Sequence, residues 1–152
     1  MPHTAAMDLL LPDPDSQPEF YADVPLKRLI AWGVDTVITA LISALILPFT
    51  AFTGLFFFPL LMLVTGFVYR TATLASGSAT WGMRLAAVEF RDRHGHRFDL
   101  TTAFLHTAGY HISISAFPLQ ILSIALMLGS RRAQGLTDHL MGTVALNRAA
   151  RF

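Results

Sequence analysis

One acidic side chain interrupts the most apolar part of the sequence, and its position gives it the clearest potential for chemistry. Asp35 is the only charged residue among the 40 positions 29–68. An ionised carboxylate at membrane depth is costly, so such a group must face protein or water and needs a partner there. Asp35 is therefore the first candidate for a proton or cation site.

Asp35 belongs to a stripe of side chains, here called the polar seam, that recurs every three or four residues: Arg28, Trp32, Asp35, Thr39 and Ser43. This spacing places all five on one face of a helix. Two interpretations remain open. The seam packs the helix against its neighbours, with Asp35 paired to a basic side chain elsewhere, or it forms a path for a proton or cation. Arg28 alone is typical of a headgroup anchor at the cytoplasmic surface.

Near the carboxyl end, Asp138 and His139 are the other residues that could do chemistry. Composition alone favours Asp138 as the cap of a short helix and His139 as an exposed surface residue. The other histidines predict no metal site, because His106 and His111 lie on different helix faces and the turn at 94–96 lacks a third ligand. We expect no cofactor and, without a nucleophile motif, no enzymatic activity.

The elements that must position these residues are membrane helices. Hydrophobic residues make up 53% of the 152 residues and charged residues only 14%, whereas soluble domains are about 25% charged. The net charge of +1 gives no reason to expect nucleic acid as a partner, and the expected partner is the lipid bilayer. Because a span needs about 20 apolar residues, we predict helices over 26–47 and 55–69, with an extension to 74 left open. A third apolar stretch, 100–130, contains Pro118.

Together these segments predict an all-α membrane protein with a helical hairpin plus a third apolar helical segment, three or four helices in all. The polar stretch 76–99 predicts a loop or a short β-hairpin at the cytoplasmic face. Residues 1–25 are rich in proline and acid and predict a disordered tail. Residues 26–146 are then the membrane domain, and residues 147–152 a short polar tail.

The distribution of Lys and Arg predicts how the protein lies in the membrane. Two precede the first helix, none lies in the turn after it, five follow the second helix and four follow the third stretch. Because cytoplasmic flanks collect basic residues, we expect a multi-pass protein of the cell (inner) membrane with a cytoplasmic amino terminus. Two alternatives stay open for 100–130: one tilted span with a basic outer end, or an interfacial helix plus a re-entrant or shortened hairpin bent at Pro118. The arginine count favours the second.

Three patches of the sequence, in this order, resemble the RDD family of small bacterial membrane proteins, named for one arginine and two aspartates. They are RLIAWGVD at 28–35, SATWGMRL at 78–85 and GLTDHLMGTV at 135–144. The resemblance covers about residues 26–146. It implies that Arg28, Asp35 and Asp138 are the family's signature residues, so that Asp138 is more than a cap.

The central patch also departs from the family pattern. Ser78 stands where the family usually has Gly, and Met83 stands where it often has Lys, a charge that Arg84 is a candidate to supply. The resemblance further implies that residues 144–146 lie beside residues 87–88 at the cytoplasmic face.

Two functions from different classes fit these observations. In the first, the protein transports a cation, a proton or a small solute along the polar seam, with Arg28 acting on Asp35 and with Asp138 at the cytoplasmic mouth. The resemblance implies the same class, because ion or solute transport, including sodium/proton exchange, is proposed for some members. Three or four helices rarely enclose a path alone, so this function predicts a homo-oligomer. In the second, the protein is a non-enzymatic membrane scaffold or assembly partner whose seam binds other helices.

Overall fold

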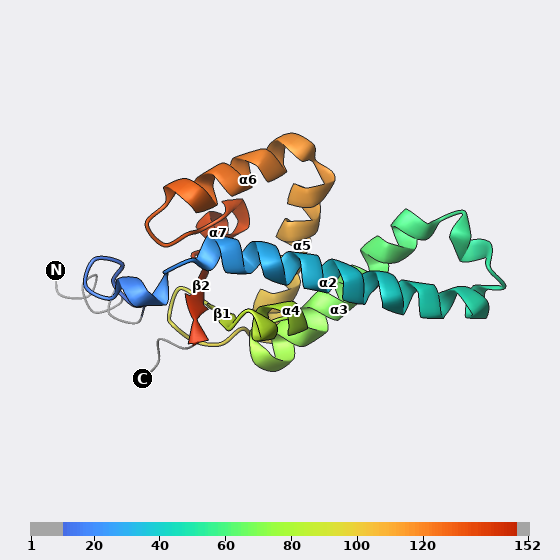
Figure 1. The fold of residues 1–152 in the computed structure, drawn as a ribbon, viewed down its shortest axis with the longest axis horizontal. Helices are drawn as coiled ribbons and strands as arrows, with labels where there is room; N and C mark the ends of the chain where they lie inside the picture. Colours follow the sequence, from blue (N-terminus) through green and yellow to red (C-terminus); the bar gives the residue numbers. More distant parts are fainter. Residues whose placement is uncertain (1–10, 149–152) are drawn as a thin grey trace.

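The computed structural model describes residues 11–148 and is built around a hairpin of two long helices (Figure 1). Helices α2 (Val24–Ile46) and α3 (Phe58–Gly77) are joined by two short 3₁₀ turns, η3 (Leu47–Thr50) and η4 (Thr53–Leu55). At 1.5 Å per residue the helices are about 34 and about 30 Å long, and both are apolar enough to cross a bilayer. The predicted hairpin is confirmed, with α3 beginning later than expected and continuing past residue 74.

Proline residues help to set the ends of both helices. Pro25 and Pro59 lie in the first turns of α2 and α3, where the missing N–H is not needed for a helical hydrogen bond. Pro48 lies in η3, just after α2 ends. Ala51 and Phe52 then have left-handed backbones, with φ of 51° and 62°. These conformations help to reverse the chain within a short connection.

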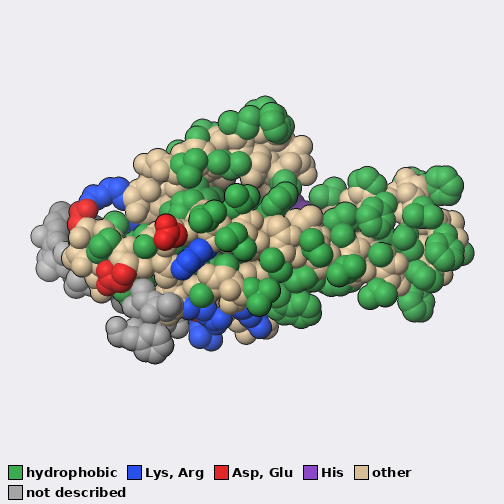
Figure 2. Space-filling model, viewed as in Figure 1, with side chains coloured by type: hydrophobic (Ala, Val, Ile, Leu, Met, Phe, Trp, Pro, Cys, Tyr) green, Lys and Arg blue, Asp and Glu red, His purple; other side chains and the backbone are tan. Residues whose placement is uncertain are grey.

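The half of the hairpin that lies farthest from the chain ends carries no charge. Residues 36–69 contain no Asp, Glu, Lys or Arg, and hydrophobic side chains cover this end of the molecule in Figure 2. Phe49 and Phe56 near the tip are 90% and 85% exposed. Apolar side chains exposed in such number indicate contact with lipid, as expected for an integral membrane protein.

The third apolar stretch forms two helices with a sharp bend between them. Helices α5 (Leu100–Ser115) and α6 (Phe117–Gly129) meet at 115°. The extended backbone of Ala116 and the position of Pro118 in the first turn of α6 account for the break. The helices are about 24 and about 20 Å long, so neither crosses an apolar layer of about 30 Å alone. The bend near Pro118 that the second alternative expects is present, and by length and composition the pair is either one broken span or a re-entrant segment. Both ends of the pair lie on the side of the small sheet (Figure 1).

Four short elements complete the fold: α4 (Trp81–Leu85), β1 (Val88–Arg91), α7 (Leu136–Met141) and β2 (Val144–Asn147). Strands β1 and β2 pair antiparallel, with Phe90 opposite Ala145. The expected short β-structure is therefore present, but its second strand comes from the carboxyl end of the chain rather than from a local hairpin within 76–99. The pairing agrees with what the family resemblance implies for residues 144–146.

The segment before α2 packs against this sheet. Residues 11–22 fell within the expected disordered tail, yet Leu11 and Tyr21 are buried against Val144 and Leu146 of β2. The Tyr21 hydroxyl donates to a backbone carbonyl of this same segment, at 2.7 Å. Apolar side chains in an otherwise polar segment cover the strand, which explains the difference. The first ten residues of that tail, and residues 149–152 of the short carboxyl tail, lie outside the described residues.

Cysteine labelling tests this arrangement, because the chain has no native cysteine. We expect a membrane-impermeant thiol reagent to modify Arg93→Cys and Arg131→Cys from one side of the membrane, since both positions lie near the sheet. Thr53→Cys, at the tip of the hairpin, should react from the opposite side. Modification of Arg131→Cys from the Thr53 side would show that α5 and α6 together cross the membrane.

Candidate functional site

Asp35 lies in the fourth turn of α2, is 8% exposed, and accepts three hydrogen bonds. The Tyr69 hydroxyl of α3 donates to Oδ1 at 2.7 Å, and the Gly82 backbone N–H donates to the same oxygen at 2.9 Å. The Thr80 hydroxyl donates to Oδ2 at 2.6 Å. All three donors are neutral. The carboxylate therefore ties α3 and the beginning of α4 to α2.

The turn that enters α4 is shaped around this carboxylate. Thr80 is the N-cap of α4, and its hydroxyl oxygen accepts a hydrogen bond from the Met83 N–H at 3.1 Å while its proton goes to Asp35. Gly82 packs so closely on α2 that a Cβ there would lie 2.3 Å from the Ala31 carbonyl oxygen and 2.7 Å from an Asp35 oxygen. The sequence Thr80-Trp81-Gly82 thus has a physical reason. Thr80 donates its hydroxyl to Asp35, and Gly82 allows the backbone of α4 to contact α2.

The two departures from the family pattern have different structural settings. Ser78 has φ of 58°, the left-handed region that favours glycine. Its hydroxyl donates to the Phe90 carbonyl at 2.7 Å and accepts from the Phe98 N–H at 2.8 Å, which offsets the backbone cost. Met83 lines the larger of the two cavities described below. Arg84 instead donates to the Ala79 carbonyl just before α4 and does not line that cavity.

Asp138 of α7 is the second buried carboxylate, 1% exposed, and both of its oxygens are occupied. Arg28 Nη1 contacts Oδ2 at 2.6 Å, and the Gly135 N–H donates to the same oxygen at 3.1 Å. His106 Nε2 of α5 and the Thr143 hydroxyl contact Oδ1 at 2.8 and 2.7 Å. One carboxylate therefore joins α2, α5, α7 and the residue before β2.

The charge state of Asp138 follows from these contacts. Burial alone would raise the pKa of its carboxyl group, but the Arg28 guanidinium and the His106 hydrogen bond outweigh burial and hold the pKa below its ordinary value. Asp138 is the third residue of α7, whose N-cap is Gly135, so the N-cap role expected from composition is not found. Its side chain instead accepts a hydrogen bond from the Gly135 N–H. The hypothesis that Arg28 acts on Asp35 is corrected, because the ion pair of Arg28 is with Asp138, 110 residues away.

Sequence reasoning gave no role to His106, Arg70 and Tyr110. The His106 ring lies against the Phe90 ring, with centroids 4.5 Å apart, and its Nδ1 has no partner among the described residues. Arg70 of α3 lies over the Tyr110 ring, with 4.2 Å from its guanidinium carbon to the centroid. The one available signal was that Arg70 alone interrupts the apolar run of α3. His139 is exposed, as expected, and among residues 11–148 no group of three potential ligands could hold a metal ion.

Comparison with known proteins agrees with the family resemblance. The model of the RDD family matches residues 23–142. The chain belongs to the RDD family. The matched range includes Arg28, Asp35 and Asp138, of which Arg28 and Asp138 form a direct ion pair. Neither the curated proteins nor the solved structures give a significant match to this RDD protein.

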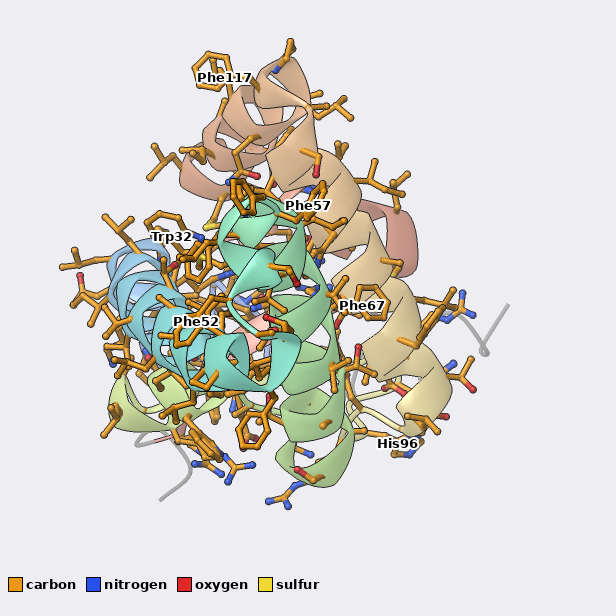
Figure 3. The ribbon with its side chains drawn as sticks, turned by 90° about the vertical axis from the view of Figure 1, so that its right-hand side faces the viewer. Trp32, Phe52, Phe57, Phe67, His96 and Phe117 are labelled. Carbon is orange, nitrogen blue, oxygen red and sulfur yellow. The ribbon has the colours of Figure 1, made fainter. Side chains whose placement is uncertain are left out.

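Two cavities meet beside Asp35. The larger, of about 590 Å³, lies between α2, α5 and α6 and is here called the α2–α6 cleft; Arg28, His106 and Asp138 line its polar part. The smaller, of about 180 Å³, lies between α2, α3 and α5. The two share five lining residues: Trp32, Asp35, Arg70, Tyr110 and Ile114. Figure 3 shows Trp32 between α2 and the α5–α6 pair.

The remaining residues of the polar seam continue along the same face of α2. Thr39 is buried and lines the smaller cavity together with Tyr69 and His111. Ser43, one turn further, is fully buried, and its hydroxyl has no partner among the described residues. The seam therefore faces the interior, and a series of polar side chains extends from the sheet side towards the uncharged half of the hairpin.

Substitution of Gly82 tests the close contact between α4 and α2. We expect Gly82→Ala to destabilise the protein by about 1–3 kcal/mol, because the added methyl group would overlap a carbonyl and the Asp35 carboxylate. Gly33→Ala on α2 is the matched control, since a Cβ at Gly33 meets nothing within 4 Å. Thermal unfolding in detergent measures both. Equal stability of the two variants would show that α4 does not depend on this contact.

Proposed function

We propose that this RDD protein moves a proton or a small ionic solute through the membrane along the polar seam. The observation that carries the proposal is the pair of cavities that share Asp35, Arg70 and Tyr110. Together they extend from the Arg28–Asp138 ion pair to Thr39, well inside the apolar hairpin. A cavity lined by ionisable groups at membrane depth is typical of ion and proton pathways.

The two carboxylates are suited to different roles. Asp138 is held by an arginine and a histidine, so protonating it would break an ion pair. Asp35 contacts neutral donors only, so a proton or cation can bind there with loss of hydrogen bonds but of no ion pair. Asp35 is therefore the group proposed to carry the ion. The Arg28–Asp138 ion pair is proposed to have a structural role, holding α2 and α7 together at the sheet side of the pathway.

Orientation and assembly complete the proposal. Most of the basic residues lie outside the two spans, towards the sheet. This supports the inference that the amino terminus and the sheet face the cytoplasm and that the protein belongs to the cell (inner) membrane. Two spans and a bent helix pair enclose little volume, and a homo-oligomer would complete the walls of the pathway.

The alternative function is a membrane scaffold. It is favoured by the three hydrogen bonds of Asp35, since a carboxylate fully used in tying α3 and α4 to α2 has a structural purpose of its own. The two functions predict different consequences of removing the charge. A transport residue is essential to flux, whereas a packing residue changes stability and assembly.

Flux measurements in inside-out vesicles separate the two functions. Na⁺, K⁺ and Li⁺ are added separately to vesicles that hold a proton gradient and contain wild type, Asp35→Asn or empty membrane, at matched protein abundance. We expect at least one cation to collapse the gradient in wild type, and Asp35→Asn to reduce that rate to the level of empty membrane.

Asp23→Asn is the matched control, because Asp23 undergoes the same chemical change but is exposed, precedes α2 and caps no N–H. It should transport as wild type does. Flux in Asp35→Asn equal to wild type would remove Asp35 from the pathway. No flux above empty membrane for any cation would contradict cation/proton exchange, and lower abundance or stability of Asp35→Asn alone would then favour the scaffold.

A further inference from the structure

The α2–α6 cleft has two unlike parts. Its outer walls are apolar side chains of α2 and α6 that are largely exposed on the protein surface: Leu26, Leu29, Ile124 and Leu128. Its inner part is polar and contains Arg28, Asp35, Arg70, His106 and Asp138. The surface is hollowed between α6 and the hairpin in Figure 2. A cleft with apolar walls at the lipid boundary and charged groups inside matches an amphiphile rather than a purely polar solute.

Arg70 is the inner group whose charge has no partner. Within residues 11–148 its side chain forms no ion pair and no hydrogen bond, and its buried Nε is unsatisfied. The guanidinium rests on Tyr110 and lies 6.0 Å from the centre of the Phe90 ring, and Arg28 lies 5.2 Å from the same centre. A buried guanidinium with no anion in contact with it is unfavourable. The carboxylates of Asp35 and Asp138 act on Arg70 only through space. Because Arg28 is already paired with Asp138, Arg70 is the arginine of the cleft that has no anion in direct contact.

Phosphate is the anion that fits this position best. A planar guanidinium binds two phosphate oxygens at once, more favourably than a point charge does. The cleft also holds polar groups of the bent pair, including Ser113, Gln120 and Ser123. Its volume of about 590 Å³ can hold a phosphate headgroup and the first methylenes of its chains, but not a whole phospholipid. The remaining chain would lie along the exposed apolar walls.

We propose that the α2–α6 cleft binds an anionic membrane phospholipid, with the phosphate on Arg70 and an acyl chain between Leu29 and Ile124. Nothing in this proposal requires that the protein transports an ion. The same guanidinium chemistry would accept free phosphate, so the test separates the lipid from the soluble anion.

Native mass spectrometry of the detergent-purified protein gives the number and affinity of bound lipids. The probes are phosphatidylglycerol, phosphatidylcholine and inorganic phosphate, each titrated separately. We expect one phosphatidylglycerol to bind wild type at least ten times more tightly than phosphatidylcholine, and excess inorganic phosphate to leave it bound. Displacement by millimolar inorganic phosphate, or equal affinity for the two lipids, would overturn the proposed anionic lipid.

Three variants locate the bound lipid. Arg70→Gln should lose at least tenfold in affinity for phosphatidylglycerol, whereas Arg84→Gln, the same change outside the cleft, should bind as wild type does. Ile124→Trp fills the cleft from an exposed wall position without changing charge, so it tests the site even where Arg70→Gln fails to fold. Its affinity should also fall at least tenfold. Wild-type affinity in Ile124→Trp, or in folded Arg70→Gln, would overturn the proposal.

Discussion

A buried carboxylate must receive its hydrogen bonds from other groups of the protein, and this constraint organises the structure. Asp35 and Asp138 are both buried, and each accepts bonds from several segments that lie far apart in the sequence. Their donors include residues in α4 and on both sides of α7, and the nearby elements are short. Helix α4 has five residues, α7 has six, and each strand has four. Isolated elements of that length are unstable in water. The two carboxylates fix α4 and α7, and through Thr143 the residue that leads into β2.

This constraint also connects Arg28, Asp35 and Asp138, the three residues that the family resemblance singles out. Arg28 compensates the charge of Asp138, and the pair connects the first membrane helix to the segment that leads into β2. Asp35, two turns further along α2, holds the turn that leads towards β1 through Thr80 and Gly82. The two interactions thus bring the approaches to both strands to the same end of the hairpin. A cavity remains between Asp35 and the Arg28–Asp138 ion pair. Arg70 lines this cavity and has no ion-pair partner among the described residues.

The parts of the fold that depend on composition could be predicted from the sequence, and the parts that depend on distant pairs could not. Apolar length predicts the hairpin, and helical spacing predicts that Thr39 and Ser43 share the face of Asp35. No local pattern connects Arg28 with a residue 110 positions later, and only the family resemblance indicated that Asp138 is more than a helix cap. The donors to Asp35 are neutral and common residue types, so the prediction of a basic partner was wrong. The role of Arg70 depends on a cavity that forms only in the folded chain.

A double-mutant cycle on the Arg28–Asp138 pair tests the central role of the buried carboxylates most directly. Arg28→Gln and Asp138→Asn should each destabilise the protein by about 3–5 kcal/mol, while the double variant should lose clearly less than the sum of the two. The coupling should persist as the pH falls towards the ordinary carboxyl pKa of 3.8 and weaken below it, because the ion pair lowers the pKa of Asp138 in the folded state. The exposed Arg131–Asp15 pair is the control and should show no measurable coupling. Equal coupling in the two pairs would contradict a structure held together by buried carboxylates.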